Sequence, residues 1–239
     1  MVREDAIDPS RQLAVQLPDA LDALLILADA ELREIDAFAV ATGPGSFTGL
    51  RIGIATMQGL AFAEGKPLIG LSALTALSAI ASPAFLGSRI ATWVDAWRGD
   101  VYAALYEDGR AAGEPVVASP ADLLDALAPR SDSANASSDK KGAPYADQEP
   151  AVRVANDILF VGDGAETYRD TIVARLGHAA RIADPVSPLL AGMIATLATI
   201  AYGHGDRPPP HAIRPLYVRR PDAELAKQRH AELRVSHAD

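Results

Sequence analysis

The chain contains no cysteine among its 239 residues, which excludes disulfides and metal sites built on thiolates. Aromatic residues are scarce at 5%, and basic residues are outnumbered by acidic ones, 22 against 31. The formal net charge of −9 argues against this chain alone binding a phosphate backbone, because that contact requires clustered Lys and Arg. The composition leaves open that a basic partner subunit supplies this charge.

Long apolar runs are also absent. Asp, Gly or Pro interrupts each apolar stretch well short of the roughly 18–20 residues that a membrane span requires. The opening segment, MVREDAIDPSRQ, is polar and of mixed charge, unlike the apolar core of a signal peptide. Hydrophobic residues nevertheless make up 49% of the chain, so most of it should fold around a core. We therefore expect a cytoplasmic protein that makes no contact with a membrane.

The order of the predicted elements indicates an α/β architecture with parallel strand pairing. Residues 12–31 have the apolar spacing of a helix, in which Pro18 should occupy the first turn. The elements predicted after it are a buried strand at 36–42, a helix at 49–64, a buried strand at 67–71 and a helix at 73–81 with Ser72 as its cap.

The pattern changes after residue 85, where two strands joined by a glycine-containing turn are typical of a hairpin. The elements predicted there are strands at 89–96 and 101–107, a helix at 120–128 capped by Ser119, a strand at 157–162, helices at 164–176 and 187–203, and an extended segment at 215–221. We predict two lobes, residues 1–85 and 86–225, followed by a flexible tail at 226–239. Residues 131–150 are rich in Ser, Ala, Asp and Pro, so we expect a disordered insertion there.

A glycine-rich loop, GPGSFTGLRIG at 43–53, connects a predicted buried strand to a helix. A P-loop would require a lysine, and none occurs between Gly43 and Lys66. A dinucleotide fingerprint has the spacing GxGxxG, and the spacing here is one residue longer. The remaining interpretation is a tight strand-to-helix turn, capped by Ser46 or Thr48 and with Gly45 at a positive φ. A less favoured form of this interpretation adds an anion bound by the free backbone N–H groups at the start of the helix.

We assign the loop a structural role, and it comprises Gly43, Pro44, Gly45, Ser46, Thr48 and Gly49. The helix that follows is apolar around most of its circumference, which indicates burial on more than one side. One stripe suits packing on its own sheet and consists of Leu50, Ile54, Met57 and Ala61. Glycine inside a helix costs about 0.5–1 kcal/mol relative to alanine, so Gly53 and Gly59 should have a packing reason. The pattern alone is equally compatible with a helix of the same chain and with a second subunit.

Four segments in order resemble the TsaB family, also called YeaZ: AVATGPGSFTGLRIGIATMQGLA, VDAWRGDVYAALY, FVGDGA and RPLYVRRPDAE. The resemblance runs from about residue 12 to residue 225, outside the insertion. It implies a two-lobed actin-like ATPase fold related to ribonuclease H. Members of the family are needed to make threonylcarbamoyladenosine in tRNA and are regarded as non-catalytic.

The resemblance also implies the partners. The family pairs with TsaD, a homologous catalytic subunit that carries the metal and transfers threonylcarbamoyl to adenosine 37 of ANN-decoding tRNAs. A TsaE-like ATPase joins the complex, tRNA is contacted only through the complex, and a homodimer is expected when TsaD is missing. ATP and metal are then used by the partner subunits, and we expect no cofactor and no catalytic residue in this chain. The helix contact of the family places the interface at Arg51, Ile52, Gly53, Ala55, Thr56, Gly59 and Ala63.

The chain departs from the family at its beginning. Family members start with a strand carrying a segment like LALDTS and a hairpin, whereas this chain starts with MVREDAIDPS. We expect a first lobe without its usual N-terminal strands, and we expect that the natural protein begins upstream; a genuine truncation with an open sheet edge is the alternative. The missing strand carries the first phosphate-loop residues of the family, which argues against nucleotide binding by this chain.

Other patterns give no support for an enzyme. The five histidines form no HxxxH or HExxH pair, and Ser46 does not lie in a GxSxG nucleophile elbow. Asp95, Arg98 and Asp100 are explained by turn chemistry and a local ion pair, and Asp163 by helix N-capping. An independent glycoprotease-like hydrolase or sugar-kinase-like ATPase stays as the alternative function, since fold does not decide function.

Overall fold

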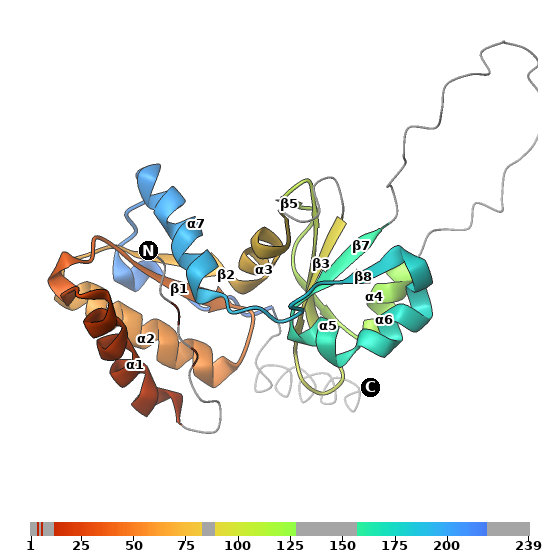
Figure 1. Cartoon of the computed structure of the whole chain (residues 1–239), viewed down its shortest axis with the longest axis horizontal. Helices are drawn as coiled ribbons and strands as arrows, with labels where there is room; N and C mark the ends of the chain where they lie inside the picture. The colour runs from red at the N-terminus through yellow and green to blue at the C-terminus, as the bar shows by residue number, and fades with distance from the viewer. Residues whose placement is uncertain (1–3, 5, 7–11, 83–88, 128–156, 219–239) are drawn as a thin grey trace, which may run out of the picture.

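The computed structural model describes residues 4, 6, 12–82, 89–127 and 157–218. The predicted insertion at 131–150 and the predicted tail at 226–239 lie outside these residues. Figure 1 shows two lobes side by side, with helix α3 (Ala73–Ala81) between them.

The first lobe is built on a small parallel sheet. In the described part of the chain this sheet has two strands, β1 (Phe38–Gly43) and β2 (Leu68–Ser72), with Phe38 opposite Leu68. Helix α2 (Phe47–Ala63) connects them and packs mainly on β1, and α1 (Leu13–Ala28) lies against α2. The opposite face is covered by α7 (Ala191–Gly203), which comes from the far end of the sequence (Figure 1).

The second lobe is built on a larger mixed sheet with the strand order β5-β4-β3-β7-β8, and β6 also pairs with β4. Its strands are β3 (Arg89–Asp95), β4 (Val101–Glu107), β5 (Arg110–Ala111), β6 (Val116–Ala118), β7 (Ile158–Val161) and β8 (Ala180–Ile182). The predicted hairpin is β3 and β4, which pair antiparallel over their whole length, whereas β3, β7 and β8 run parallel.

Helices cover both faces of this sheet. On one face α4 (Pro120–Leu127) and α6 (Arg169–Leu176) enclose a core that includes Trp93, Phe160, Leu124 and Ile172. The rings of Trp93 and Phe160 meet edge to face, with centroids 5.2 Å apart. On the other face α3 contributes Leu74, Leu77 and Ala81 to a second core. Helix α3 therefore joins the two sheets.

One polar contact fixes α3 on the second sheet. The hydroxyl groups of Thr75 and Tyr106 lie 3.1 Å apart in a hydrogen bond. Burial raises the pKa of the Tyr106 hydroxyl above its ordinary value, and the hydrogen bond with Thr75 partly opposes this effect. The neutral hydroxyl is thus the form that the fold favours.

The chain returns to the first lobe after the second sheet. Residues 208–217, here called the C-terminal strap, run along β2 and α2. Leu68 N donates to Pro208 O at 3.3 Å, and the Gln58 side-chain amide donates to Pro210 O and Ile213 O at 2.9 and 3.1 Å. Leu216 N then donates to Thr42 O at 2.7 Å. The strap and α7 thus lie on the first sheet, and the boundaries proposed for the lobes remain predictions.

Most predicted elements are present, and four details differ. The helix predicted at 187–203 begins only at Ala191. The helix predicted at 164–176 is two helices, α5 (Asp163–Thr167) and α6, because Tyr168 between them has φ −107° and ψ 22°. Pro18 is not in the first turn, since α1 begins at Leu13 and holds Pro18 in its interior with the ring exposed. The extended segment predicted at 215–221 forms no strand up to residue 218, where the described residues end.

Candidate interaction surface

The glycine loop is a tight turn between β1 and α2. Gly43 has φ +117°, and a Cβ on it would lie 3.0 Å from Leu50 Cδ1 and 3.2 Å from Leu216 O. Glycine is therefore required at position 43. The expectation that Gly45 supplies the positive φ is wrong, because the register of β1 already shifts between Ala41 and Gly43 and the chain turns there.

Ser46 is the N-cap of α2, and its hydroxyl accepts a hydrogen bond from Gly49 N at 3.3 Å. Thr48, the other cap considered from the sequence, is the second residue of α2 and is exposed. Gly49 faces α1, because a Cβ on it would lie 3.9 Å from Leu13 Cδ2. The loop thus sets the direction of α2, and Gly49 serves the contact between α1 and α2 and not the outward face.

The inner side of α2 is the one that the sequence pattern predicts. Ile54 and Ala61 are buried, and Met57 packs against the small core formed by Phe38, Ala61 and Leu68. Gln58 is held by the strap on one flank of the helix. The helix is therefore fixed on its sheet side and on both flanks.

The outer face of α2 is uncovered among the described residues. It consists of the exposed residues Thr48, Arg51, Ala55, Gly59, Phe62 and Ala63. Phe62 has 82% of its surface exposed. A Cβ on Gly53 or on Gly59 would have no atom within 4 Å, so no described element of this chain fills the space beside these glycines.

The seven predicted interface residues differ in exposure. Arg51, Ala55, Gly59 and Ala63 lie on the outer face, whereas Ile52, Gly53 and Thr56 are half-buried at its border. Phe62 is absent from the predicted set although it is the most exposed large apolar residue of the helix. Phe62 lies seven residues, about two helical turns, after Ala55, and this spacing places both residues on the same face. Sequence alone does not show which face of an apolar helix is open.

A preformed cluster stands at the N-terminal end of this face. The Arg51 guanidinium lies 3.8 Å above the centroid of the Phe47 ring, and its Nε donates to the Tyr217 hydroxyl at 3.1 Å. The rings of Phe47 and Tyr217 are 5.4 Å apart. Arg51 is thereby held in one orientation while its side chain remains exposed. Sequence reasoning missed Phe47 and Tyr217, since Tyr217 lies 166 residues from Arg51.

The segment FVGDGA in the second lobe closes against β3. Gly162 has φ +114°, and a Cβ on it would lie 2.1 Å from Trp93 O. The expectation that Asp163 is a helix N-cap is wrong, because Gly162 occupies that position. The Asp163 carboxylate instead accepts hydrogen bonds from Asp95 N at 3.0 Å and Gly164 N at 2.8 Å. Asp163 therefore ties the β7–α5 junction to the end of β3.

The turn between β3 and β4 is explained by turn chemistry. The Asp95 carboxylate accepts a hydrogen bond from Trp97 N at 2.9 Å, and Ala96 N donates to Asp100 O at 3.0 Å. Trp97, Arg98 and Gly99 all have positive φ, which makes the turn tight. The Asp95 carboxylate thus stabilises the backbone of this turn.

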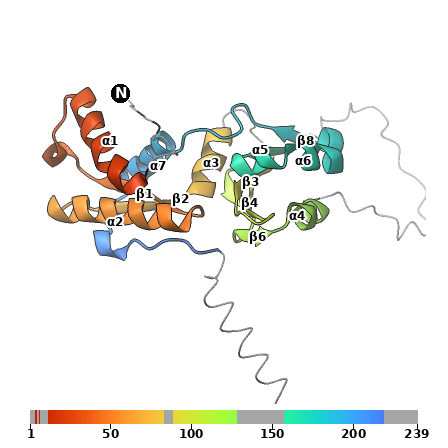
Figure 2. The same ribbon diagram turned by 90° about the horizontal axis from the view of Figure 1, so that it is seen from below.

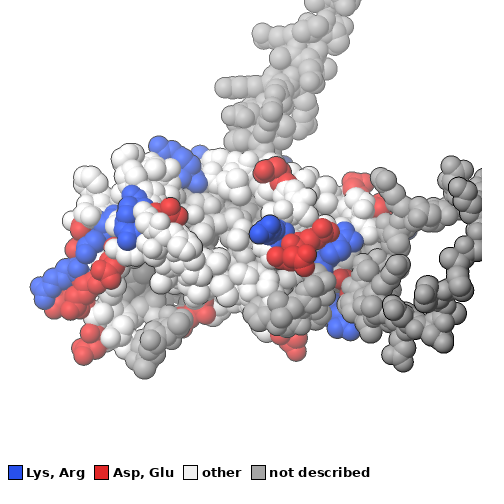
Figure 3. All heavy atoms as spheres, turned by 90° about the horizontal axis from the view of Figure 1, so that it is seen from above, with Lys and Arg blue, Asp and Glu red and all other residues white. Residues whose placement is uncertain are grey.

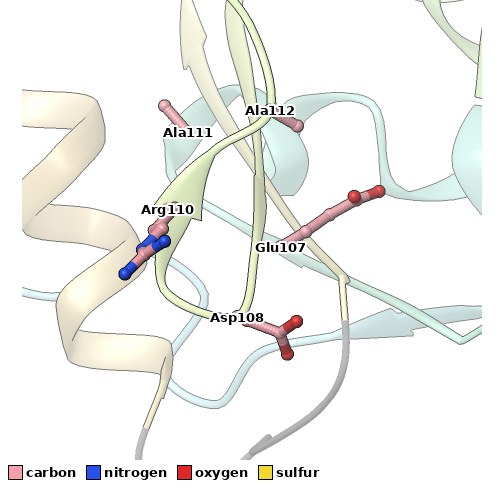
Figure 4. A pocket seen from close by; sticks show the side chains of 5 residues that line it. All are labelled: Glu107, Asp108, Arg110, Ala111 and Ala112. Atoms are coloured by element: carbon pink, nitrogen blue, oxygen red, sulfur yellow. The ribbon is translucent and has the colours of Figure 1, made fainter.

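Two shallow hollows occur in the second lobe. One, of about 550 Å³, is lined by Glu166, Arg169 and residues 182–187. The other, of about 470 Å³, lies at the end of the β4–β5 hairpin. Figure 4 shows that Glu107, Asp108 and Arg110 there point in different directions and not toward one centre. The side chains that line the hollow at the β4–β5 hairpin therefore form no convergent set of reactive groups.

Three further findings concern charge, metal ligands and membrane spans. On the face seen in Figure 3, acidic and basic side chains are interspersed over both lobes and form no basic stripe. Among the described residues, no group of three or more His, Asp or Glu side chains is placed to hold a metal ion. No described helix combines the length and apolar character needed to cross a bilayer.

Comparisons with known proteins agree with this architecture. The model of the family described as TsaD, tRNA N6-adenosine threonylcarbamoyltransferase, matches residues 7–227. An uncharacterised protein of Mycobacterium tuberculosis H37Rv is 32% identical over 209 residues, which cover 85% of this chain and 74% of the relative. The tRNA threonylcarbamoyladenosine biosynthesis protein TsaB of Escherichia coli is 40% identical over 84 residues, 35% of this chain. That alignment spans 36% of the length of the E. coli protein.

A solved structure extends the likeness to the fold. YeaZ from Pseudomonas aeruginosa is 28% identical, with a TM-score of 0.62 over 86% of each chain. The chain is thus a two-lobed α/β protein of the kind represented by YeaZ, and the fold class expected from the sequence is confirmed. It belongs to the TsaD family of tRNA N6-adenosine threonylcarbamoyltransferases, within which it resembles the TsaB (YeaZ) proteins, as the sequence motifs predicted.

Proposed function

We propose that this chain is a TsaB-type accessory subunit in the biosynthesis of tRNA threonylcarbamoyladenosine. It dimerises with a TsaD-like homologous subunit and activates it, and the transfer chemistry, the metal and the ATP belong to the partners. A TsaE-like ATPase and tRNA join through the complex. The observation that carries the proposal is the uncovered outer face of α2 in a chain of this family.

The shape of the outer face suits a helix from another subunit. Ala55, Gly59 and Ala63 give it a low profile, so a second helix can approach to the 8–10 Å typical of packed helices. Phe62 projects at one end of this face and Phe47 at the other. Burying a side chain such as Phe62 contributes about 1.5–3 kcal/mol. This free energy is available to stabilise a complex, because Phe62 is exposed in the isolated chain.

The Arg51 cluster supplies the polar part of the contact. Interfaces concentrate their binding energy in aromatic and Arg side chains near the centre of the buried patch. Arg51 is already oriented by Phe47 and Tyr217, so docking fixes few additional side-chain rotations. The strap residue Tyr217 thereby becomes part of the interface although it is distant in sequence.

The test is co-purification with the TsaD-like subunit of the same organism. We expect Ala55→Arg to abolish the complex because it places a long charged side chain in the middle of the outer face, and Gly53→Leu to weaken it strongly by filling the space at its border. Val173→Arg is the matched control, since Val173 is 48% exposed on α6 in the other lobe. Circular dichroism should show all three variants folded.

Two outcomes would contradict the proposal. A complex that survives both α2 substitutions with unchanged affinity places the interface elsewhere. A loss of threonylcarbamoyladenosine in cells carrying Val173→Arg but not Ala55→Arg would assign the function to the second lobe. Calorimetry with ATP and Mg²⁺ on the isolated chain addresses the enzyme alternative, and we expect neither binding nor turnover.

A further inference from the structure

Arg51 carries the only charge of helix α2. The helix runs from Phe47 to Ala63, and every other residue between these ends is uncharged. Among the described residues, Arg51 takes part in no ion pair, so no carboxylate of this part of the chain balances its charge. The outer face of α2 therefore presents one isolated positive charge on a surface that is otherwise uncharged.

The surroundings of Arg51 use only part of its hydrogen-bonding capacity. A guanidinium has five N–H donors and no acceptor. The Tyr217 hydroxyl accepts one hydrogen bond, from Nε, and the Phe47 ring lies against the flat side of the group. The terminal nitrogens Nη1 and Nη2 donate to no acceptor among the described residues. Both are left to bind a group from outside this part of the chain.

The C-terminal strap holds the guanidinium in its orientation. The strap runs alongside α2 in the opposite direction, because it contacts Gln58 first and then Arg51, which comes seven residues earlier in the helix (Figure 2). Leu216 N donates to Thr42 O at 2.7 Å, so the backbone next to Tyr217 is anchored on β1. Tyr217 thus positions Arg51 from a fixed point of the first lobe.

Docking of a second helix on the outer face would remove water from this charge. Ala55 lies about one helical turn after Arg51, so a helix that packs over Ala55 and Gly59 also covers the guanidinium. Arginine stays protonated in proteins. A charge that loses its water is strongly unfavourable unless an opposite charge pairs with it. A wholly apolar partner would leave Arg51 unpaired, so the partner has to supply a negative group.

The surroundings of Arg51 favour a carboxylate as this group. Two carboxylate oxygens match the fork of a guanidinium, and the first turn of a helix also favours a negative group. A phosphate of tRNA has the same charge, but phosphate-backbone contacts require clustered Lys and Arg. Arg51 stands alone on α2, in a chain with a net charge of −9. A carboxylate on a protein helix suits both the single charge and the low profile beside it.

We propose that the helix of the TsaD-like subunit that docks on α2 carries an Asp or Glu whose carboxylate accepts two hydrogen bonds from Arg51. This inference rests on the proposed function. Arg51 and Phe62 are about 16 Å apart along the axis of α2, so the carboxylate lies roughly three turns of the partner helix from the site that receives Phe62. The charge pair fixes the register of the two helices, because small apolar residues alone allow several. Tyr217 is a positioning residue for this pair.

Calorimetric titration of the full chain with the TsaD-like subunit tests the charge pair. Arg51→Gln should raise the Kd at least about thirtyfold, because it leaves the carboxylate buried and unpaired. Arg51→Lys should recover part of the affinity, since lysine keeps the charge without the fork. Added salt should weaken binding of the unsubstituted chain more steeply than binding of Arg51→Gln. Arg175→Gln is the control, because it removes the same charge from α6 in the other lobe and should leave the Kd unchanged.

Two further experiments locate the carboxylate and test the role of Tyr217. Arg51→Glu should abolish binding, and replacing one Asp or Glu of the partner's docking helix with Arg should restore the Kd to within about tenfold. Tyr217→Phe should raise the Kd about fivefold when Arg51 is present and leave it unchanged in Arg51→Gln, because Tyr217 acts through Arg51. Circular dichroism is the folding control for every variant.

Three outcomes would overturn the proposal. If Ala55→Arg abolishes the complex and Arg51→Gln leaves the Kd unchanged, the interface stands and the carboxylate does not. If no charge reversal on the partner's docking helix restores binding of Arg51→Glu, the paired group is not a carboxylate of that helix. If Arg51→Gln weakens only the binding of tRNA to the assembled complex, Arg51 contacts a phosphate instead. A complex that survives Ala55→Arg and Arg51→Gln alike contradicts the proposed function as well.

Discussion

The two lobes differ in how completely they bury their own apolar surface. Among the described residues, the second lobe surrounds a six-stranded sheet with cores on both faces, whereas the first has a two-stranded sheet and a core of Phe38, Ala61 and Leu68. The second lobe therefore has enough buried apolar surface to be stable by itself. The first lobe leaves apolar surface exposed, and we expect a partner to cover it. The proposed partner surface, the outer face of α2, lies on the first lobe.

The largest effect should come from the core of the second lobe. Phe160 is fully buried and packs edge to face on Trp93. Phe160→Ala should lower the free energy of unfolding by about 3–5 kcal/mol through lost burial and a new cavity. Urea unfolding measures this. A loss no larger than that of an exposed substitution would mean that the second lobe does not carry the stability of the chain.

Two glycine substitutions should act with opposite signs. Gly162→Ala should destabilise by about 2–4 kcal/mol, because the residue has φ +114° and its Cβ would meet Trp93 O. Gly53→Ala should stabilise by about 0.5–1 kcal/mol, because alanine is preferred inside a helix and the space beside it is empty. Thermal unfolding of both variants checks the pair. Destabilisation by Gly53→Ala would show that something already covers that side of α2.

An exposed phenylalanine should matter for binding and not for stability. Phe62→Ala should change the free energy of unfolding by less than about 0.5 kcal/mol, since the side chain is almost fully exposed. It should weaken binding to the TsaD-like subunit by about 2 kcal/mol, roughly thirtyfold in Kd. Calorimetric titration gives the Kd. The reverse pattern, a stability loss with unchanged Kd, would remove Phe62 from the interface.

The smallest effect concerns alkaline pH and the contact that joins α3 to the second sheet. The pKa of Tyr106 is raised in the folded chain above its ordinary value of 10.0. The unfolded chain ionises first as the pH rises, so the stabilisation is complete below about pH 10 and is lost above it. Tyr106→Phe should reduce this alkaline loss in urea unfolding near pH 9 and pH 11. Equal losses in the two proteins would contradict the burial of the hydroxyl.

The sequence predicts most elements because their signals are local. Apolar spacing, the caps Ser46, Ser72 and Ser119, and the glycine turns define elements within one or two turns of chain. The inner stripe of α2 follows from the same periodicity. These signals also carried the family resemblance, which supplied the fold class.

Other features depend on contacts between distant segments, and periodicity does not report them. The strap on Gln58, the cluster of Tyr217 with Arg51 and the position of α7 on the first sheet all join residues more than 100 positions apart. The sequence indicates that α2 is apolar on several sides, but the exposure of Phe62 depends on where α1 and the strap leave it free. The shift of the turn from Gly45 to Gly43 depends on the β1 register.

Thiol protection at Ala55 tests the central claim most directly. Ala55→Cys places a single thiol in the middle of the outer face, because the chain has no cysteine of its own. In the complex with the TsaD-like subunit, its alkylation should slow by at least about tenfold relative to the free chain, as expected for a residue at the desolvated centre of an interface. Val173→Cys should be alkylated at the same rate in both states. Unchanged alkylation of Ala55→Cys in a complex that has formed would contradict docking through α2.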